Sequence, residues 1–433
     1  VEPLGFVLPV YKDQRPPGWM LRAGLFAYDL MARHLQHRPL DVSELLMVAP
    51  HIREQGLQGG LLYPDAQTDD ARLTLRVIQE ALAGGRNAAA LNYARAELLR
   101  ENGRVCGVRV QDCVYGRSAE VRTTVVINAS GSWADRVRGQ IGAAPRLRPL
   151  RGSHLVFPYH RLPVAQAVSL FHPQDRRPVF VFPWEGAVIV GTTDLDHAGD
   201  LDQEPVISAG EADYLMHALH YQFPALNVQL EHAIASYCGV RPVIAGGHAD
   251  PSKESREFAL WDEEGLLTIT GGKLTTFRTT ALQVLRAARR QLPALSALRD
   301  DAPILDPLPQ PSVAGLDNAI TRRLYGRYGA LAGRLLAEAR EGDLNPIGDS
   351  VYLWAELRWA AMHEAVVHLQ DLLLRRTRIG LVMREGGIPL LPRIREYCQP
   401  LLGWDDTRWS AEENAYRELW QGAYSVPRTG AGA

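Results

Sequence analysis

The stretch from Leu266 to Arg278 constrains the fold most, because its side-chain pattern changes abruptly at a double glycine. Residues 267–270 alternate apolar and hydroxyl side chains, which predicts a strand, whereas from Thr275 the apolar residues recur at helical spacing. Glycines at such a joint adopt backbone angles that other residues avoid, and a helix start offers free N–H groups to an anionic ligand. Either Gly271-Gly272 and Lys273 bind a ligand here, or the joint is only a tight turn beside a surface lysine.

The composition is that of an ordinary globular protein with a large core. Of 433 residues, 46% are hydrophobic and 22% charged, which suffices for two or three domains. Because the formal net charge is only −2, we expect no nucleic-acid partner. The four cysteines lack metal-binding spacing, so neither a zinc site nor a disulfide framework is expected, and this usage fits a reducing compartment.

Two local signals precede residue 112. Thr68-Asp69-Asp70 precedes an amphipathic pattern that ends at Gly84-Gly85, which predicts a helix capped by an aspartate. Residues 88–99 and 104–111 then have the pattern of strands, and Asn102-Gly103 between them is a strong hairpin signal. The sequence therefore predicts a helix followed by a β-hairpin.

The next signal is a β-branched run over residues 121–128. It predicts a buried strand, which leads into the small residues Ala129-Ser130-Gly131 and then into a helix over 134–141. Small residues occur at this position in dinucleotide-binding α/β layers, where the cofactor passes close to the backbone. We therefore expect a cofactor layer in this part of the chain.

The middle third contains short apolar segments separated by turn residues. Strands are predicted over 153–157, 179–182 and 187–191, and they suggest the antiparallel sheet of a second domain. A ligand would then lie between the two layers. The acidic residues that follow, Asp194 with Asp196, fit no calcium-loop spacing and indicate a polar turn at a strand end.

Basic residues follow the predicted sheet. Arg241, Arg256 and Lys273 would be costly to bury without an anion, and the planar fork of arginine suits phosphate or carboxylate. Either these cations surround an anionic ligand, or they are scattered surface residues.

Helical patterns dominate the last part of the chain. The proline-rich segment 300–315 reads as a linker. Helices are predicted over 355–370, 372–381 and 410–420, with a short element over 392–398, which indicates a separate helical domain.

The segment Leu8 to Leu30 combines aromatic and basic side chains, among them Trp19, Phe26 and Arg22. A basic helix that carries aromatic residues can lie in a membrane interface. It can equally be a buried connecting helix.

A set of short motifs, in this order and spacing, resembles the FAD-dependent glycerol-3-phosphate dehydrogenases. The resemblance covers essentially the whole chain. The motifs are Pro-Gly-Trp-Met-Leu-Arg at 17–22, Thr-Asp-Asp-Ala-Arg at 68–72, Asn-Ala-Ser-Gly-Ser-Trp at 128–133, Gly-Ser-His-Leu-Val at 152–156, Phe-Pro-Trp at 182–184, Gly-Thr-Thr-Asp at 191–194, Gly-Val-Arg-Pro at 239–242 and Gly-Gly-Lys-Leu-Thr-Thr-Phe-Arg at 271–278.

The resemblance implies an α/β fold with an added α-helical domain. The α/β part is an FAD-dependent oxidoreductase core of the glutathione-reductase-like, D-amino-acid-oxidase type, with an antiparallel-sheet substrate domain. The family begins with a βαβ unit that carries G-x-G-x-x-G, and because this sequence has no such pattern, we expect it to lack that unit. The expected division is a core over 1–308 (cofactor layer mainly 60–145 and 260–295, substrate sheet mainly 150–260 with 1–55 contributing) and a helical C-terminal domain over 309–433.

The resemblance also implies an activity: oxidation of sn-glycerol 3-phosphate to dihydroxyacetone phosphate, with hydride transfer to FAD and electron transfer to a membrane quinone. It implies a cytoplasmic protein that lies peripherally on the anionic inner face of the cytoplasmic membrane, and a homodimer is possible. Two alternatives remain: a glycerophosphate oxidase that uses dioxygen, and a truncated, non-catalytic remnant without the flavin pyrophosphate site.

The matching motifs imply roles for individual residues. Phosphate would be bound by Arg256 and Lys273 with help from Thr276, while Arg241 would lie near the reacting hydroxyl. His154 is implied as a base or orienting group, because imidazole can accept that proton, although it is equally a hydrogen-bonded strand histidine. Catalytic roles are thus expected for Arg241, His154 and Lys273. The implied flavin contacts are Ala94, Ser130, Gly131, Gly271, Gly272, Leu274 and Thr275.

Overall fold

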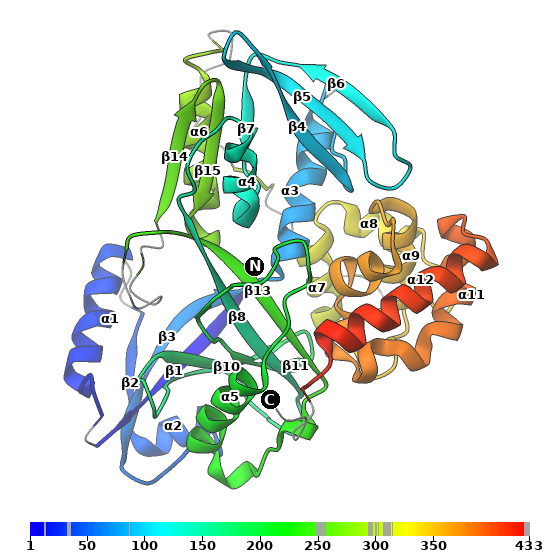
Figure 1. The fold of residues 1–433 in the computed structure, drawn as a ribbon. Coiled ribbons are helices and arrows are strands. Elements are labelled where there is room, and N and C mark those ends of the chain that lie inside the picture. Colours follow the sequence, from blue (N-terminus) through cyan, green and yellow to red (C-terminus); the bar gives the residue numbers. More distant parts are fainter. Residues whose placement is uncertain are drawn as a thin grey trace.

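Figure 1 shows the computed structural model of the chain. It describes residues 1–12, 14–32, 36–85, 87–247, 254, 257–292, 298, 301, 303–305, 313 and 315–427. Within these residues the strands form one nine-stranded sheet and two three-stranded sheets. The large sheet lies at the base of Figure 1, the two small sheets lie above it, and the C-terminal helices flank them on one side.

The large sheet combines strands from the N-terminal segment and from the middle third of the chain. They are β1 (Glu2–Tyr11), β2 (Arg38–Leu40), β3 (Leu57–Gln67), β8 (Leu147–Pro158), β9 (Ala167–Phe171), β10 (Pro178–Trp184), β11 (Ala187–Gly191), β12 (Leu195–Asp196) and β13 (Ala235–Ile244). Their order is β12-β8-β11-β10-β9-β1-β3-β2, and β13 also pairs with β8. The pairs are antiparallel except β1 with β9. The predicted antiparallel sheet of the middle third is confirmed, and β1 to β3 extend it.

The two faces of the large sheet bury different cores, because side chains alternate along a strand. Leu155 and Phe157 of β8 pack with α2 (Val42–Val48) and α5 (Ala209–Gln222). Val156 of β8 faces the other way, together with Ala235 of β13, and packs against the C-terminal helices. The second face therefore runs from the helical domain toward the small sheets.

Two small sheets are formed by segments in which the cofactor layer is expected. One has the order β14-β15-β7, in which β7 and β15 are parallel, and the other is the antiparallel sheet β4-β5-β6. The predicted strand, double glycine and helix are confirmed, as is the Asn102-Gly103 hairpin. The elements are α3 (Asp70–Gly84), β4 (Ala94–Glu101), β5 (Arg104–Asp112), β6 (Ser118–Arg122), β7 (Val126–Asn128), the 3-10 turn η1 (Gly131–Trp133), α4 (Ala134–Gly139), β14 (Phe258–Glu263), β15 (Leu266–Gly271), the 3-10 turn η5 (Leu274–Thr276) and α6 (Phe277–Ala288).

Helices make up the C-terminal part, as predicted. They are α7 (Asn318–Tyr328), α8 (Leu331–Ala337), α9 (Trp354–His363), the π-helical η6 (Asp371–Arg376), α10 (Ile379–Val382), the 3-10 segment η7 (Arg384–Leu390), α11 (Leu391–Leu402), α12 (Asp406–Leu419) and the π-helical η8 (Trp420–Tyr424). The division expected at residue 308 and most of the predicted linker 300–315 lie outside the described residues.

Several predicted boundaries were wrong. The helix predicted over 355–370 ends at His363, because Ala365 has a left-handed φ of 48°. The helix predicted over 372–381 is two short elements, because the extended Thr377 separates η6 from α10.

The strand predicted over 121–128 is also two strands. β6 pairs with β5, whereas β7 pairs with β15 in the other sheet. The Thr123 hydroxyl accepts a hydrogen bond from the Val125 N–H, which turns the chain between the two sheets. The first predicted strand begins at Ala94 rather than at residue 88.

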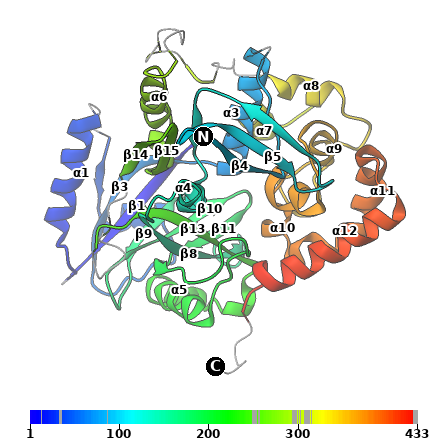
Figure 2. The ribbon, with the colours of Figure 1, turned by 45° about the horizontal axis from the view of Figure 1, so that its top comes forward.

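The N-terminal segment begins with a strand, so the helix predicted within Leu8 to Leu30 is only its second part. Residues 8–11 belong to β1, and α1 spans Gly18–Ala32. In Figure 2, α1 lies on the side of the molecule opposite the C-terminal helices. Searching the described residues finds no helix with the length and apolarity needed to cross a membrane.

Candidate functional site

His154 and Tyr237 lie side by side on the sheet face that runs from the helical domain to the small sheets. They are cross-strand partners in β8 and β13. Their rings are stacked, with centroids 4.5 Å apart and an interplanar angle of 7°. Such a pair restricts both rings, because each one limits the rotation of the other.

The surroundings of His154 keep its imidazole neutral near pH 7. Gly191 of β11 pairs with His154, and a Cβ atom at Gly191 would lie 2.2 Å from the imidazole, so only glycine leaves room for the ring. Burial, and then the positive charge of Arg241, lower the pKa of His154 to about 3. Its Nδ1 is enclosed and has no hydrogen-bond partner among the described residues. The ring is therefore a neutral imidazole, in which one nitrogen carries a proton and the other can accept one.

We expect this histidine to destabilise the folded protein in acid. Because the folded-state pKa of about 3 lies below the ordinary value of 6.5, the unfolded chain binds one more proton between these pH values. The free energy of unfolding should fall as pH decreases through this window, by at most about 1.4 kcal/mol per pH unit. Denaturant unfolding of the wild type and of His154→Gln at several pH values measures this difference. An identical pH dependence in both proteins would contradict a buried, neutral His154.

Arg241 lies four residues beyond Tyr237 on the same strand face. Its Nη1 is 3.2 Å from Asp194 Oδ1, and its Nη2 donates a hydrogen bond of 3.0 Å to Thr192 Oγ1. The guanidinium lies directly against the backbone of Gly152, because a Cβ atom at that position would lie 2.3 Å from Nη2. Asp194 therefore supplies a carboxylate that partly balances the charge of Arg241.

The cofactor side is built by two adjacent strand ends. β7 and β15 are parallel, so the small residues after β7 and the double glycine after β15 emerge at the same edge. Asn128 holds the first turn, because its Oδ1 accepts a hydrogen bond of 2.6 Å from Ser130 Oγ. Thr270 Oγ1 donates to Gly131 O at 3.4 Å, which joins the two turns.

The turns at these strand ends require glycine and leave the backbone accessible. Gly271 and Gly272 have φ values of 75° and 82°, and a Cβ atom at Gly271 would lie 2.7 Å from Glu257 O. Gly131 has a φ of 60°, and no atom lies within 4 Å of its would-be Cβ. The side chains that follow the double glycine, residues 273–277, are exposed. The edge is therefore open to a ligand that approaches the main chain.

The structure brings most of the predicted site residues to this region, and β13 links its two halves. Ser132, which follows Gly131, donates from Oγ to the Val240 carbonyl at 2.9 Å, next to Arg241. At the other end of β13, Ile244 Cδ1 lies 3.5 Å from the would-be Cβ of Gly271. The strand thus spans from the His154 face to the double glycine.

Four predicted residues need separate description. Lys273 precedes η5 and is exposed, and Thr276 Oγ1 donates to the Lys273 carbonyl at 3.0 Å. Ala94 is exposed at the start of β4, in the sheet β4-β5-β6. Arg256 lies outside the described residues.

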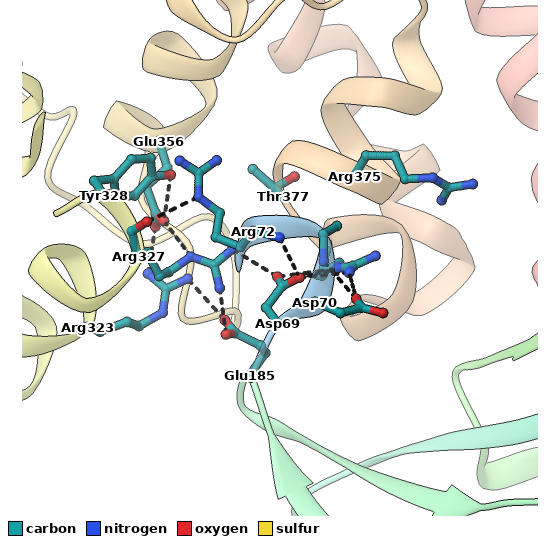
Figure 3. A network of polar contacts seen from close by, with 12 residues as sticks. Asp69, Asp70, Arg72, Glu185, Arg323, Arg327, Tyr328, Glu356, Arg375 and Thr377 are labelled. Carbon is teal, nitrogen blue, oxygen red and sulfur yellow. Dashed lines mark hydrogen bonds and ion pairs between the residues drawn. The ribbon is translucent and has the colours of Figure 1, made fainter. Parts of the chain in front are cut away.

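A buried network of ion pairs lies where α3 meets the C-terminal helices (Figure 3). Asp69 caps α3, as predicted, by accepting from the Arg72 N–H at 3.2 Å. Its carboxylate also accepts from Arg378 at 2.7 Å and from Arg327 at 3.2 Å. Burial alone raises the pKa of Asp69, but Arg378 and Arg327 outweigh it and lower the pKa to about 2. The network therefore fastens α3 to the helical domain.

A pocket adjoins this network, between α3, the β10–β11 turn and α7. Its lining includes Arg72, Arg327 and Glu185, but none of the residues predicted for the flavin or substrate site. Arg327 pairs with Glu185 at 2.7 Å, so the charges in its wall largely satisfy each other. The pocket therefore does not coincide with the predicted flavin and substrate residues.

The sequence interpretation missed Tyr237 and the anchoring role of Asp194 and Thr192. Tyr237 can be recognised as a site residue only from its cross-strand pairing with His154. Asp194 and Thr192 could have been predicted, because they belong to the Gly-Thr-Thr-Asp motif. The aspartate was instead interpreted as part of a polar turn.

Comparison with known proteins agrees with this architecture. The family described as FAD dependent oxidoreductase matches residues 3–278, so the chain is an FAD-dependent oxidoreductase. A second family, the C-terminal domain of alpha-glycerophosphate oxidase, matches residues 267–409.

Individual relatives show which family of FAD-dependent oxidoreductases the chain resembles. A glycerol-3-phosphate dehydrogenase of Mycobacterium leprae is 34% identical over 429 residues, which are 93% of this chain and 72% of that protein. The aerobic glycerol-3-phosphate dehydrogenase of Staphylococcus epidermidis is 29% identical over 99% of this chain and 81% of its own length. The X-ray structure of the glycerol-3-phosphate dehydrogenase from Bacillus halodurans complexed with FAD has a TM-score of 0.79 and 25% identity, over 100% of this chain and 83% of that one. The chain belongs to the glycerol-3-phosphate dehydrogenase family.

Proposed function

We propose that this protein oxidises the central hydroxyl of sn-glycerol 3-phosphate to dihydroxyacetone phosphate and passes the electrons to a membrane quinone. The observation that supports this proposal most is that the neutral imidazole of His154 and the guanidinium of Arg241 lie on one face of the large sheet. The strand that carries Arg241 also reaches Gly271, at the turn where FAD is proposed to bind. Membership in the glycerol-3-phosphate dehydrogenase family supports the same substrate.

The flavin would be held at the ends of β7 and β15. Bound FAD supplies the acceptor for the hydride that leaves the substrate carbon. Gly271, Gly272, Leu274 and Thr275 would contact it at the start of η5, where N–H groups and the helix dipole favour negative charge. Ser130 and Gly131 would line its other side, and Ala94 would lie toward the adenine.

His154 would take the proton of the reacting hydroxyl. The proposed acceptor is the imidazole, and its Nδ1 has no hydrogen-bond partner among the described residues. An anionic substrate beside Arg241 offsets the positive charge that helps to lower the pKa of His154. Substrate binding would therefore make His154 a stronger base. Arg241 would orient the hydroxyl end.

The phosphate would be bound by Lys273 and Arg256, with the Thr276 hydroxyl beside them. Lys273 makes no ion pair within the part of the chain that the structure describes, in contrast to Arg241. An exposed ammonium at a helix start is suited to an entering phosphate.

We expect Lys273→Met to weaken substrate binding while flavin binding is retained. A charged hydrogen bond to phosphate contributes about 1.5–3 kcal/mol, so KM should rise about ten- to hundredfold. Steady-state kinetics with sn-glycerol 3-phosphate measures the change. Glycerol, which has no phosphate, is the matched control, because its slow turnover should be the same in the variant and the wild type. An unchanged KM for the phosphorylated substrate would refute the role of Lys273.

The surface of α1 supports contact with a membrane. Trp19, Phe26 and Leu30 are 71%, 52% and 68% exposed, and Arg22 is also exposed. The alternative of a buried connecting helix is therefore wrong. Aromatic side chains and a basic residue on one exposed helix suit the interface of an anionic bilayer, where a quinone is reached. We propose that the protein binds the inner face of the cytoplasmic membrane in this way.

The double substitution Trp19→Glu with Arg22→Glu should release the protein from anionic vesicles. It introduces charge at an exposed aromatic position and reverses a basic charge that contributes about 1 kcal/mol near such a surface. Co-sedimentation with vesicles measures binding, and unchanged thermal unfolding shows that the fold is intact. A double variant that binds vesicles as tightly as the wild type would place the membrane surface elsewhere.

The second candidate function is a glycerophosphate oxidase that uses dioxygen. It is favoured by the match of residues 267–409 to the C-terminal domain of alpha-glycerophosphate oxidase. Substrate-dependent formation of hydrogen peroxide in air, compared with reduction of a soluble quinone analogue without oxygen, distinguishes the two acceptors. Fast peroxide formation with slow quinone reduction would favour the oxidase.

A further inference from the structure

We propose that Asp194 and Thr192 are positioning residues that hold the guanidinium of Arg241 at the substrate face of the sheet and thereby control the rate of substrate oxidation. This inference rests on the proposed function, because it assigns a role to the surroundings of the same site. Neither residue is expected to touch the substrate.

The turn after β11 approaches Arg241 from one side. Asp194 Oδ1 lies 3.2 Å from Nη1, Thr192 Oγ1 accepts from Nη2 at 3.0 Å, and the Thr193 carbonyl lies 3.5 Å from Nη1. These contacts reach both terminal nitrogens of the guanidinium, so they fix its rotation as well as its place.

Gly152 supports the guanidinium from the strand side. A Cβ atom there would lie 2.3 to 2.6 Å from three guanidinium atoms, so the group rests directly on the backbone of β8. The turn and the glycine together leave the Arg241 side chain 31% exposed, whereas the Asp194 side chain is only 8% exposed. A buried carboxylate is costly without a cation, and Arg241 is one cation that Asp194 contacts. The remaining exposed part of Arg241 is what a substrate can meet.

The position of this ion pair distinguishes it from a pair that only stabilises the fold. Arg241 lies on the same strand face as Tyr237, whose ring is stacked on His154. The charge of Arg241 also acts on the imidazole, since it helps to lower the pKa of His154. A change in the orientation of Arg241 would therefore affect both the reacting hydroxyl of the substrate and His154, which would take the proton of that hydroxyl.

The expected kinetic effect is a lower rate at nearly unchanged substrate affinity. The proposed function assigns phosphate binding to other residues than Arg241 and its turn, so KM should change less than about threefold in Asp194→Asn. Loss of orientation at the reacting end should lower the rate of flavin reduction about ten- to hundredfold. Thr192→Val removes only the hydroxyl acceptor of Nη2 and should lower the rate about tenfold.

The test is anaerobic single-turnover reduction of the flavin-loaded protein by sn-glycerol 3-phosphate, in the wild type, Asp194→Asn and Thr192→Val. The matched control is Asp196→Asn, the same chemical change two residues along. Asp196 pairs with Arg148 at 2.6 Å, and its side chain is 56% exposed. We expect wild-type rates in the control. Asp194→Glu, which keeps the charge, should recover part of the rate lost in Asp194→Asn.

The outcomes separate this inference from the proposed function. If the wild type is not reduced by sn-glycerol 3-phosphate, the proposed function fails. If the wild type is reduced and both variants with full flavin content react as fast, only the positioning role fails. A wild-type rate in Thr192→Val together with loss of fold in Asp194→Asn also overturns it, because Asp194 would then have a purely structural role.

Discussion

Gly272→Val should yield a protein purified without flavin. Gly272 has a φ of 82°, and its would-be Cβ lies 3.2 Å from Phe258 Cβ. A β-branched side chain is strained at this φ and is tight against Phe258, so it should distort the joint at which the cofactor is proposed to approach the backbone. The flavin-to-protein ratio, measured by absorbance, should fall to near zero.

A matched control separates backbone strain from cofactor contact. Gly116, in the turn between β5 and β6, has a φ of 71° and no atoms within 4 Å of its would-be Cβ. Gly116→Val therefore carries similar strain in open space and should keep its flavin. A normal flavin content in Gly272→Val, or equal loss in both variants, would contradict a specific flavin contact at Gly272.

Asp69→Ala should destabilise the fold by about 3–5 kcal/mol, because it removes the buried carboxylate that two buried cations share. Arg327 and Arg378 are 6% and 10% exposed in their side chains, and both pair with Asp69. The substitution also removes the N-cap of α3, which contributes about 1 kcal/mol. Denaturant unfolding measures the loss.

Asp70→Asn is the control for this prediction. Its carboxylate is also a partner of Arg378, at 2.9 Å, but its side chain is 76% exposed. Exposed pairs contribute about 0–1 kcal/mol, so this variant should unfold nearly as the wild type does. If the two variants lost equal stability, the buried network would not be what fastens α3 to the helical domain.

Much of the fold could be predicted from the sequence, because its strongest signals are local. The change of period at Gly271-Gly272 and the hairpin at Asn102-Gly103 each follow from neighbouring residues, and both are confirmed. The strand over 121–128 was mispredicted because its two halves have the same β-branched pattern but pair in different sheets. The alternation of side chains within a segment does not specify which strand that segment pairs with.

Site residues that belong to a sequence motif could be predicted. Residues that join the site only through strand pairing could not. The double glycine and Arg241 stand in motifs, and the structure connects them through β13. Tyr237 has no such signal, since its importance arises from its register opposite His154. The partnership of Asp194 with Arg241 likewise depends on a turn that returns to a strand far along the chain.

The most direct test of the account is anaerobic addition of sn-glycerol 3-phosphate to the flavin-loaded protein while the visible absorbance of oxidised flavin is followed. We predict that the absorbance bleaches with one equivalent of substrate oxidised per flavin, that dihydroxyacetone phosphate is formed, and that glycerol at the same concentration bleaches it far more slowly. Flavin that binds the protein but stays oxidised in the presence of sn-glycerol 3-phosphate would contradict the assignment of this site.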